Sequence, residues 1–409
     1  MMSVSGARSM RNVWLALAAA FMGVFAFRLS IPVVAFYTRF VLEASAISIG
    51  ALMAVFFAAR TPASIVAGRV YRDKGSIVAA SICLILSGVV TLCYAWAGSV
   101  VFVLFLRFLQ GLLLGFAWTI VQIVLGASVP RRIRGTVYAV YFASGVVAFS
   151  IANAVYAALA FLTPVMILSI SLVGFTVCGI LVALMDAPRV VMRRASRDAR
   201  AARLAFGVLA ATVFFVFMMG LCTAFVLSDI TYVYLKETYG LSKAAVARLF
   251  ALASAIAIPA SILLNLFADR VSDKLAVILT GMFAMLGLLA FSSPDFIVSC
   301  CGLFLLIMGG NCLTPLSRKL ALTYRQAEGV GYVSAARSLG VMLSSLTAGL
   351  VYQSVKTHVL NMILLSVPAA IAIMASSLVL AVLIGREQAY SLTSPPSVKG
   401  PLGAPHGGR

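Results

Sequence analysis

The stretch PASIVAGRVYRDKGS, residues 62–76, has a diverged counterpart in PASILLNLFADRVSDK, residues 259–274. Both begin with Pro-Ala-Ser-Ile, continue through apolar residues and end in a small charged cluster. The two stretches lie about half of the 409-residue chain apart. A second pair, RGTVYAVYFAS at 134–144 and EGVGYVSAARS at 328–338, repeats at nearly the same spacing. Two blocks in the same order at one spacing indicate that the chain consists of two related halves.

The composition indicates that a lipid bilayer surrounds most of this chain. Hydrophobic residues make up 63% of it, charged residues make up 10%, and the mean hydropathy is +1.10. Soluble domains average nearer half apolar and a quarter charged. A membrane-spanning helix needs about 20 apolar residues. We expect spans over 13–38, 46–68, 76–97, 99–127, 136–160, 163–185, 206–234, 244–267, 275–292, 296–317, 331–355 and 359–384.

The chain has 31 Lys and Arg against 11 Asp and Glu, and the basic residues lie mostly in the loops between the expected spans. Most of the bases fall in segments on one side of the expected spans, and we assign Arg318, Lys319 and Arg337 to that side. This asymmetry predicts a multi-pass protein of the plasma membrane with both termini in the cytoplasm. Anionic headgroups of the lipid bilayer account for the excess, and nucleic acid is rejected as a partner.

The expected domain organisation follows from these spans. It consists of a cytoplasmic N-terminus (1–12), an N-terminal six-helix bundle (13–185), a cytoplasmic linker (186–205), a C-terminal six-helix bundle (206–384) and a disordered cytoplasmic tail (385–409). An even number of spans in each half gives the halves parallel topology about an axis along the membrane normal. The predicted fold class is an all-α membrane protein with twelve transmembrane helices in two pseudo-symmetric bundles.

The chain resembles the major facilitator superfamily over residues 10–385. The resemblance rests on RFLQG at 107–111 and on the loops that follow the second and eighth expected spans. The family pattern in the first loop is Gly, three residues, Asp-Arg, any residue, Gly. Here Gly68 and Gly75 hold the glycine positions, whereas Arg72 stands at the Asp position and Asp73 follows it. The second loop retains the acidic and basic pair as Asp269 and Arg270.

The resemblance implies alternating access, in which the two halves rock about a central site. Carboxylates beside helix N-termini and arginines could hold the cytoplasmic side shut. The residues predicted to form this gate are Gly68, Arg72, Asp73, Gly75, Asp269 and Arg270. The alternative for the bases in these loops is that they set topology alone.

Four ionisable residues fall deep inside expected spans: Arg28, Arg60, Arg107 and Asp229. A charge in the bilayer interior is costly, so each should face a partner or water. We predict substrate contacts for Arg28 and Arg107, proton coupling for Asp229 and a structural role for Arg60. The alternatives are an ion pair that locks Arg28 and Arg107 to Asp229, and an outer-rim position for Asp229.

One face of the fourth span is too polar to contact lipid. Arg107, Gln110, Trp118 and Gln122 share it at helical spacing, which predicts a cavity wall. Further predicted substrate contacts on other spans are Asn153, Tyr232 and Asn311. Interhelical hydrogen bonding is the alternative for these three.

The favoured function is transmembrane transport of a small molecule by a monomeric secondary transporter, with proton coupling left open. More buried arginines than carboxylates favour an organic anion or a zwitterion. One alternative is efflux of hydrophobic compounds, and another is a receptor or sensor on the same scaffold. The sequence shows no nucleophile–base pair, phosphate-binding glycine loop or metal-site spacing, so we expect no enzyme activity, no cofactor and no metal.

Overall fold

A computed structural model describes residues 4–44, 46–71, 74–159, 162–188, 199–223, 239–240, 243–354 and 358–393. The described chain is helical. The helices of the first half are α1 (Val4–Phe36), α2 (Ala46–Val70), α3 (Lys74–Cys93), α4 (Val100–Ser128), α5 (Arg134–Ala158) and α6 (Pro164–Ala183). Those of the second half are α7 (Ala199–Thr223), α9 (Lys243–Arg270), α10 (Asp273–Phe291), α11 (Phe296–Ser354) and α12 (His358–Thr393). Short turns η1 (Tyr37–Val41), η2 (Tyr94–Trp96) and η3 (Arg131–Ile133) join some of them.

Helix α11 contains two antiparallel segments. A Cβ added to Gly329 would lie 2.7 Å from the carbonyl oxygen of Ala321, whereas eight residues of straight helix separate two positions by about 12 Å. The helix therefore folds back sharply between them. We call 296–324 the first segment of α11 and 329–354 the second. These segments correspond to the spans expected over 296–317 and 331–355.

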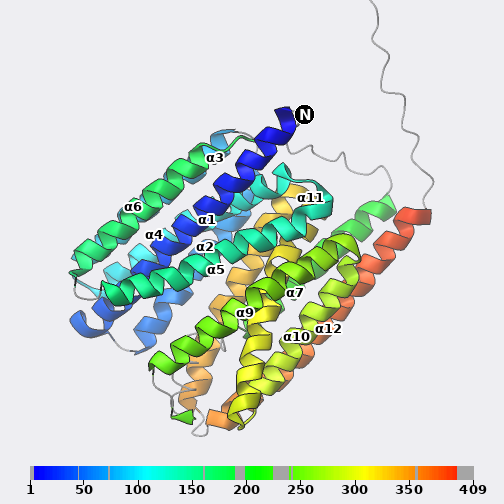
Figure 1. The fold of residues 1–409 in the computed structure, drawn as a ribbon. Helices are drawn as coiled ribbons and strands as arrows, with labels where there is room; N and C mark the ends of the chain where they lie inside the picture. The colour runs from blue at the N-terminus through cyan, green and yellow to red at the C-terminus, as the bar shows by residue number, and fades with distance from the viewer. Residues whose placement is uncertain are drawn as a thin grey trace, which may run out of the picture.

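The helices form two groups that pack side by side (Figure 1). Within the first group, α1 packs on α5 and α6, and α4 packs on α2 and α3; within the second, α7 and α10 both pack on α11 and α12. Contacts of α2 with α11 and of α5 with α9 join the groups. Ten described segments are long and apolar enough to cross a membrane. This arrangement confirms the predicted helical membrane fold.

The repeated Pro-Ala-Ser stretch makes the same interaction in both halves. In the first half, the Ser64 hydroxyl of α2 donates to the carbonyl of Gly115 on α4, at 3.3 Å. In the second half, the Ser261 hydroxyl of α9 donates to the carbonyl of Asn311 on α11, at 2.8 Å. Equivalent serines thus fasten equivalent helix pairs, as expected for two copies of one bundle.

Exposed bases mark one end of the bundle, where α2 and α4 end and α3 and α5 begin. They include Arg69, Lys74, Arg131, Arg132 and Arg270. We call this the basic end. The start of α1 and the last turn of α12 lie at the same end (Figure 1).

Two expected boundaries differ from the observed helices. Helix α1 begins at Val4, and α12 continues to Thr393, into the segment predicted to be disordered. The extra turns of α12 carry charged residues that water can solvate, and the Tyr324 hydroxyl donates to Glu387 at 3.1 Å. A polar helix end of this kind lacks the apolar signal that defined the expected span.

Candidate functional site

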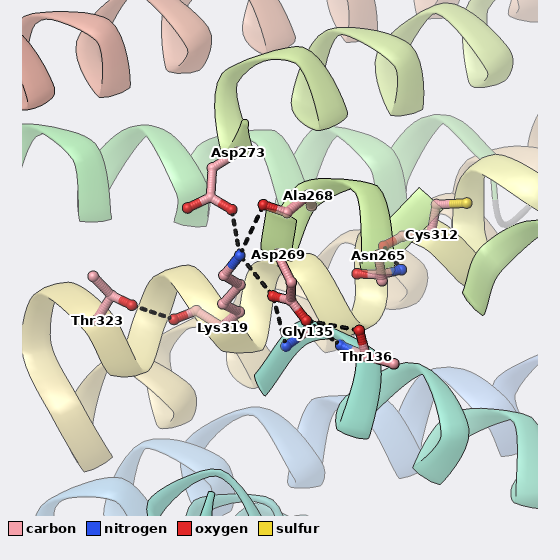
Figure 2. A network of polar contacts seen from close by, with 9 residues as sticks. All are labelled: Gly135, Thr136, Asn265, Ala268, Asp269, Asp273, Cys312, Lys319 and Thr323. Atoms are coloured by element: carbon pink, nitrogen blue, oxygen red, sulfur yellow. Dashed lines mark hydrogen bonds and ion pairs between the residues drawn. The ribbon is translucent and has the colours of Figure 1, made fainter. Parts of the chain in front are cut away.

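A carboxylate from the second half contacts the first half at the basic end. Asp269 lies at the end of α9 and faces the start of α5 (Figure 2). Its carboxylate accepts from the backbone N–H of Gly135 at 3.2 Å and of Thr136 at 2.7 Å, and from the Thr136 hydroxyl at 2.8 Å. The first N–H groups of a helix lack intrahelical partners and carry partial positive charge. Asp269 therefore caps α5 across the boundary between the halves.

Lys319 of α11 completes this arrangement from the second half. Its ammonium lies 2.7 Å from Asp269 and 2.6 Å from Asp273, and donates to the Ala268 carbonyl at 3.2 Å (Figure 2). All three ammonium protons thus have acceptors. The Asp269 side chain is 1% exposed and that of Lys319 is 5% exposed. We call Asp269, Lys319, Asp273, Gly135 and Thr136 the Asp269 network.

The pseudo-equivalent contact, between α2 and the second segment of α11, depends on close packing. A Cβ added to Gly331 would lie 2.6 Å from the Ser64 carbonyl oxygen and 3.2 Å from the Cα of Gly68. Nearby, Arg69 donates to the Tyr332 hydroxyl at 3.3 Å. The two halves therefore touch at both pairs of helix ends. Of these two contacts, the Asp269 network is the one in which a described carboxylate bridges the halves.

Three arginines from both halves meet deeper in the bundle: Arg60 of α2, Arg318 of the first segment of α11, and Arg337 of the second. Counted from the helix ends at the basic end, they lie about 9 to 15 Å inside, in the half of the spans nearer that end. Arg337 is close enough to act electrostatically on both Arg60 and Arg318, and Arg60 acts on Arg318. We call these residues the arginine cluster.

Arg318 is held firmly. Its Nε donates to the Gln122 side chain of α4 at 2.7 Å, and its Nη1 donates to the Ser317 hydroxyl at 3.3 Å. The residue is 3% exposed. Gln122 is itself tied to α5, because the Tyr138 hydroxyl donates to its carbonyl. This arginine therefore has a fixed position between the halves.

Arg60 and Arg337 are less constrained. Arg337 donates to the Thr314 hydroxyl, and no hydrogen bond from the Arg60 guanidinium is found among the described residues. The backbone of α4 comes close at this level, because a Cβ on Gly115 would lie 2.8 Å from the Arg60 carbonyl oxygen. Both guanidinium groups therefore keep donors that the described side chains leave unused.

The packing beside the arginine cluster is less tight at Arg337 and Gly310, which lie on the two segments of α11. Arg337 is exposed although its neighbours Ala336 and Ser338 are buried and its side chain bonds Thr314 of the other segment. One turn from Thr314, a Cβ on Gly310 would meet no atom within 4 Å. Arg337 is therefore accessible, and the helix packing at Gly310, one turn farther from the basic end than Thr314, leaves room for a side chain.

The structure places the predicted fourth-span residues in different surroundings. Arg107 is 2% exposed, and its Nη1 donates to Gln110 at 2.8 Å. Its guanidinium also lies 5.3 Å from the Tyr94 ring centroid. Trp118 packs on α1, where a Cβ on Gly23 would lie 2.5 Å from its ring. Of these four positions, Gln122 is the one that contacts the arginine cluster.

The other predicted substrate residues are spread over the bundle. Arg28 lies 4.5 Å from the ring centroid of Phe149 on α5. Asn311 lines a narrow gap of about 10 Å³ between α5, α9 and α11, which is room for one water. Asn153 lies on α5, and its side chain is outside the described part. Asp229 and Tyr232 are outside the described residues, so their roles stay predictions.

Some of the predicted gate residues lie at contacts between the halves, and others do not or are outside the described residues. Gly68 lies in the α2–α11 contact and Asp269 in its own network. Arg270 is exposed and lines an open pocket of about 370 Å³ over that network. Gly75 lies in the first turn of α3. Arg72 and Asp73 are outside the described residues.

The sequence analysis missed the arginine cluster. The assignment of Arg318 and Lys319 to a cytoplasmic loop is wrong, because both are buried on a candidate span that runs to Tyr324. Arg337 is likewise inside a helix. The available signal was the pair Arg318-Lys319 followed by an apolar LALTY, which continues the helix beyond residue 317.

The comparisons with known proteins agree with this fold. The family described as Major Facilitator Superfamily matches residues 13–343. Among curated proteins, no sequence matches the chain. Several solved structures share the fold at low sequence identity.

The proton:xylose symporter XylE is 14% identical, with a TM-score of 0.68, and covers 95% of this chain and 96% of its own. A bacterial homologue of the iron transporter ferroportin in an outward-facing state is 13% identical, with a TM-score of 0.67 and coverage of 92% and 99%. The human organic anion transporter MFSD10 is 11% identical, with a TM-score of 0.65 and coverage of 93% and 99%. By the match of its family over most of the chain, the protein belongs to the Major Facilitator Superfamily.

Proposed function

We propose that this protein moves a small organic anion or zwitterion across the membrane by alternating access of one central site. The observation that carries the proposal is the position of the arginine cluster. It lies at the boundary of the two halves, with the Asp269 network toward the basic end and with Arg337 exposed beside the loosely packed Gly310. A site placed in this way can be reached from one side at a time, and rocking of the halves would exchange the sides.

The orientation follows from the exposed bases. We place the basic end in the cytoplasm of a plasma-membrane protein, since Lys and Arg are enriched in cytoplasmic loops. The described state is then closed toward the cytoplasm. Because the Asp269 network is a contact in which a described carboxylate bridges the halves, its loss is expected to weaken closure of this end.

Transport by reconstituted protein tests the proposal. The purified chain in liposomes should exchange labelled organic anions for the same unlabelled solute inside, and protein-free liposomes should not. Absence of exchange for anions, zwitterions and neutral solutes alike would contradict transport. Equal exchange of a hydrophobic cation would favour the efflux alternative. Binding without any exchange would favour a receptor.

Proton coupling has its own test at Asp229, the predicted proton carrier. If it carries the proton, a pH gradient should stimulate uptake by the parent protein, and the Asp229→Asn variant should lose this stimulation while retaining exchange. Asp186→Asn is the matched control, since Asp186 is partly exposed at the basic end and pairs with the exposed Arg11. Gradient-independent uptake by the parent protein would remove Asp229 from the mechanism.

A further inference from the structure

Three positive charges come together between the helices of this protein without a described carboxylate to balance them: Arg318 is buried, Arg60 is partly buried and Arg337 is exposed. The ion pairs among the described residues join Arg11 to Asp186, and Lys319 to Asp269 and Asp273. None of them includes the arginine cluster. Ionised groups inside proteins are normally paired, because burial removes the water that would otherwise stabilise them. Among the described residues, the arginine cluster therefore has no negative partner.

The surrounding side chains are suited to hold an anion. Arg318 is fixed by Gln122 and Ser317, whereas the Arg60 guanidinium has no hydrogen bond among the described groups, and its Nε is buried. The Tyr141 hydroxyl, which lies near Arg60 and Arg318, likewise has no described hydrogen bond. One positioned guanidinium group and two that keep unused donors can together surround an oxyanion, since each presents a planar fork of donors.

The cluster draws on both halves of the molecule. Arg60 belongs to the first half, and Arg318 and Arg337 belong to the second. An anion bound between them would contact both halves at once, which is what a transported substrate must do for its binding to influence their rocking. A residue pair that merely stabilised one bundle would not need to cross this boundary.

We propose that Arg60, Arg318 and Arg337 bind the substrate through two or more negative charges, so that the substrate is a small dicarboxylate or a phosphate monoester. This inference rests on the proposed function and narrows it, because a zwitterion would bring one negative charge to three guanidinium groups. The chemistry shared by the two classes is a compact array of anionic oxygens. Both match the planar donor geometry of arginine.

The first experiment measures the thermal stability of the purified full-length chain without ligand. Because the unpaired charges repel one another, Arg337→Gln should raise the melting temperature. Arg203→Gln, on an exposed turn of α7, is the matched control and should leave it unchanged. A structural arginine would behave in the opposite way, and a lower melting temperature for Arg337→Gln would overturn the proposal.

The second experiment measures binding at constant ionic strength. Succinate, glycerol phosphate and inorganic phosphate are compared with acetate, glycine and chloride. At least one dianion should bind and stabilise the parent protein, and Arg60→Gln and Arg337→Gln should each weaken that binding roughly 30-fold or more. The arms with succinate and with the phosphates separate the two substrate classes. The site would be refuted if acetate, glycine or chloride stabilised the protein as much as the dianions do. It would also be refuted if none of the probes stabilised the protein.

The outcomes for the site and for transport can be told apart. Dianion binding that depends on the arginines, without exchange in liposomes, would leave the site standing and remove the transport proposal. Exchange of neutral solutes that is unchanged in Arg337→Gln would show that the protein transports but would remove the arginines as the binding site. Arg60→Gln provides an independent test should Arg337→Gln fail to fold.

Discussion

Neutralising Asp269 should open the basic end of the molecule. In Asp269→Asn, the contacts to Gly135 and Thr136 lose their charge, and Lys319 loses one of its two carboxylate partners. Breaking a buried ion pair typically costs about 3–5 kcal/mol. Lys319 keeps Asp273 at 2.6 Å, so we take a smaller loss of about 2–3 kcal/mol for the closed state. That lowers the ratio of closed to open protein roughly 30- to 150-fold.

Spin labels at the basic end would report this change. Val70 of α2 and Lys274 of α10 are exposed and belong to different halves, so cysteines there can be labelled after the seven native cysteines are replaced. The parent protein should give one short distance between the labels. Asp269→Asn should shift most of the distribution to longer distances, because the halves separate where the labels lie.

Asp273→Asn is the matched control for this prediction. It removes the same charge from the same lysine, but Lys319 and Asp273 both belong to the second half, so no contact between the halves is lost. The distance distribution should stay close to that of the parent protein. Our reasoning fails if Asp269→Asn leaves the distances unchanged, or if Asp273→Asn opens the molecule equally.

Two further predictions concern packing and stability. Gly331→Ala should also open the basic end, because its Cβ would lie 2.6 Å from the Ser64 carbonyl oxygen, and the same labels would detect it; Gly207→Ala, which has no atom within 4 Å of the added Cβ, should not. Asn12→Ala should lower the free energy of unfolding by about 2–3 kcal/mol, since the Asn12 side chain bonds both backbone groups of Asp186 at 2.9 Å. A loss under about 0.5 kcal/mol in denaturant titration would contradict this.

The fold was predictable because its main signals are local. Apolar windows and basic loops report a membrane bundle from composition alone, and the repeated Pro-Ala-Ser stretch reports the duplication. The predicted gate position Asp269 has a bridging role because the repeat places it at a helix end that faces the other half. These inferences needed no knowledge of which distant residues touch.

The arginine cluster could not be predicted in the same way. Arg60 was recognised as a charge inside a span, but its neighbours Arg318 and Arg337 lie in the other half of the chain. A single sequence carries no information on such distant contacts. Arg318 also ends the apolar window, so the span appeared to stop at residue 317, whereas the helix continues to Tyr324 with the two charges turned inward.

The arginine cluster and the Asp269 network are linked through consecutive residues. Arg318 belongs to the cluster, and Lys319 forms an ion pair with Asp269. Repulsion between Arg60 and the two arginines of the other half opposes closure of the basic end. Two unit charges about 8 Å apart repel by about 2 kcal/mol at an effective dielectric constant of 20, which is similar to the contribution of the network. A bound dianion would remove this repulsion and favour the closed state.

Linkage then predicts how a ligand acts on the opened variant. If the dianion favours closure, closure must favour the dianion by the same factor. Succinate or inorganic phosphate, whichever binds the parent protein, should therefore bind Asp269→Asn more weakly and should return its label distances toward the short value. The double variant Asp269→Asn/Arg337→Gln should lose this response to ligand. A ligand that binds Asp269→Asn as tightly as the parent protein, without moving the labels, would show that the arginines and the network act independently.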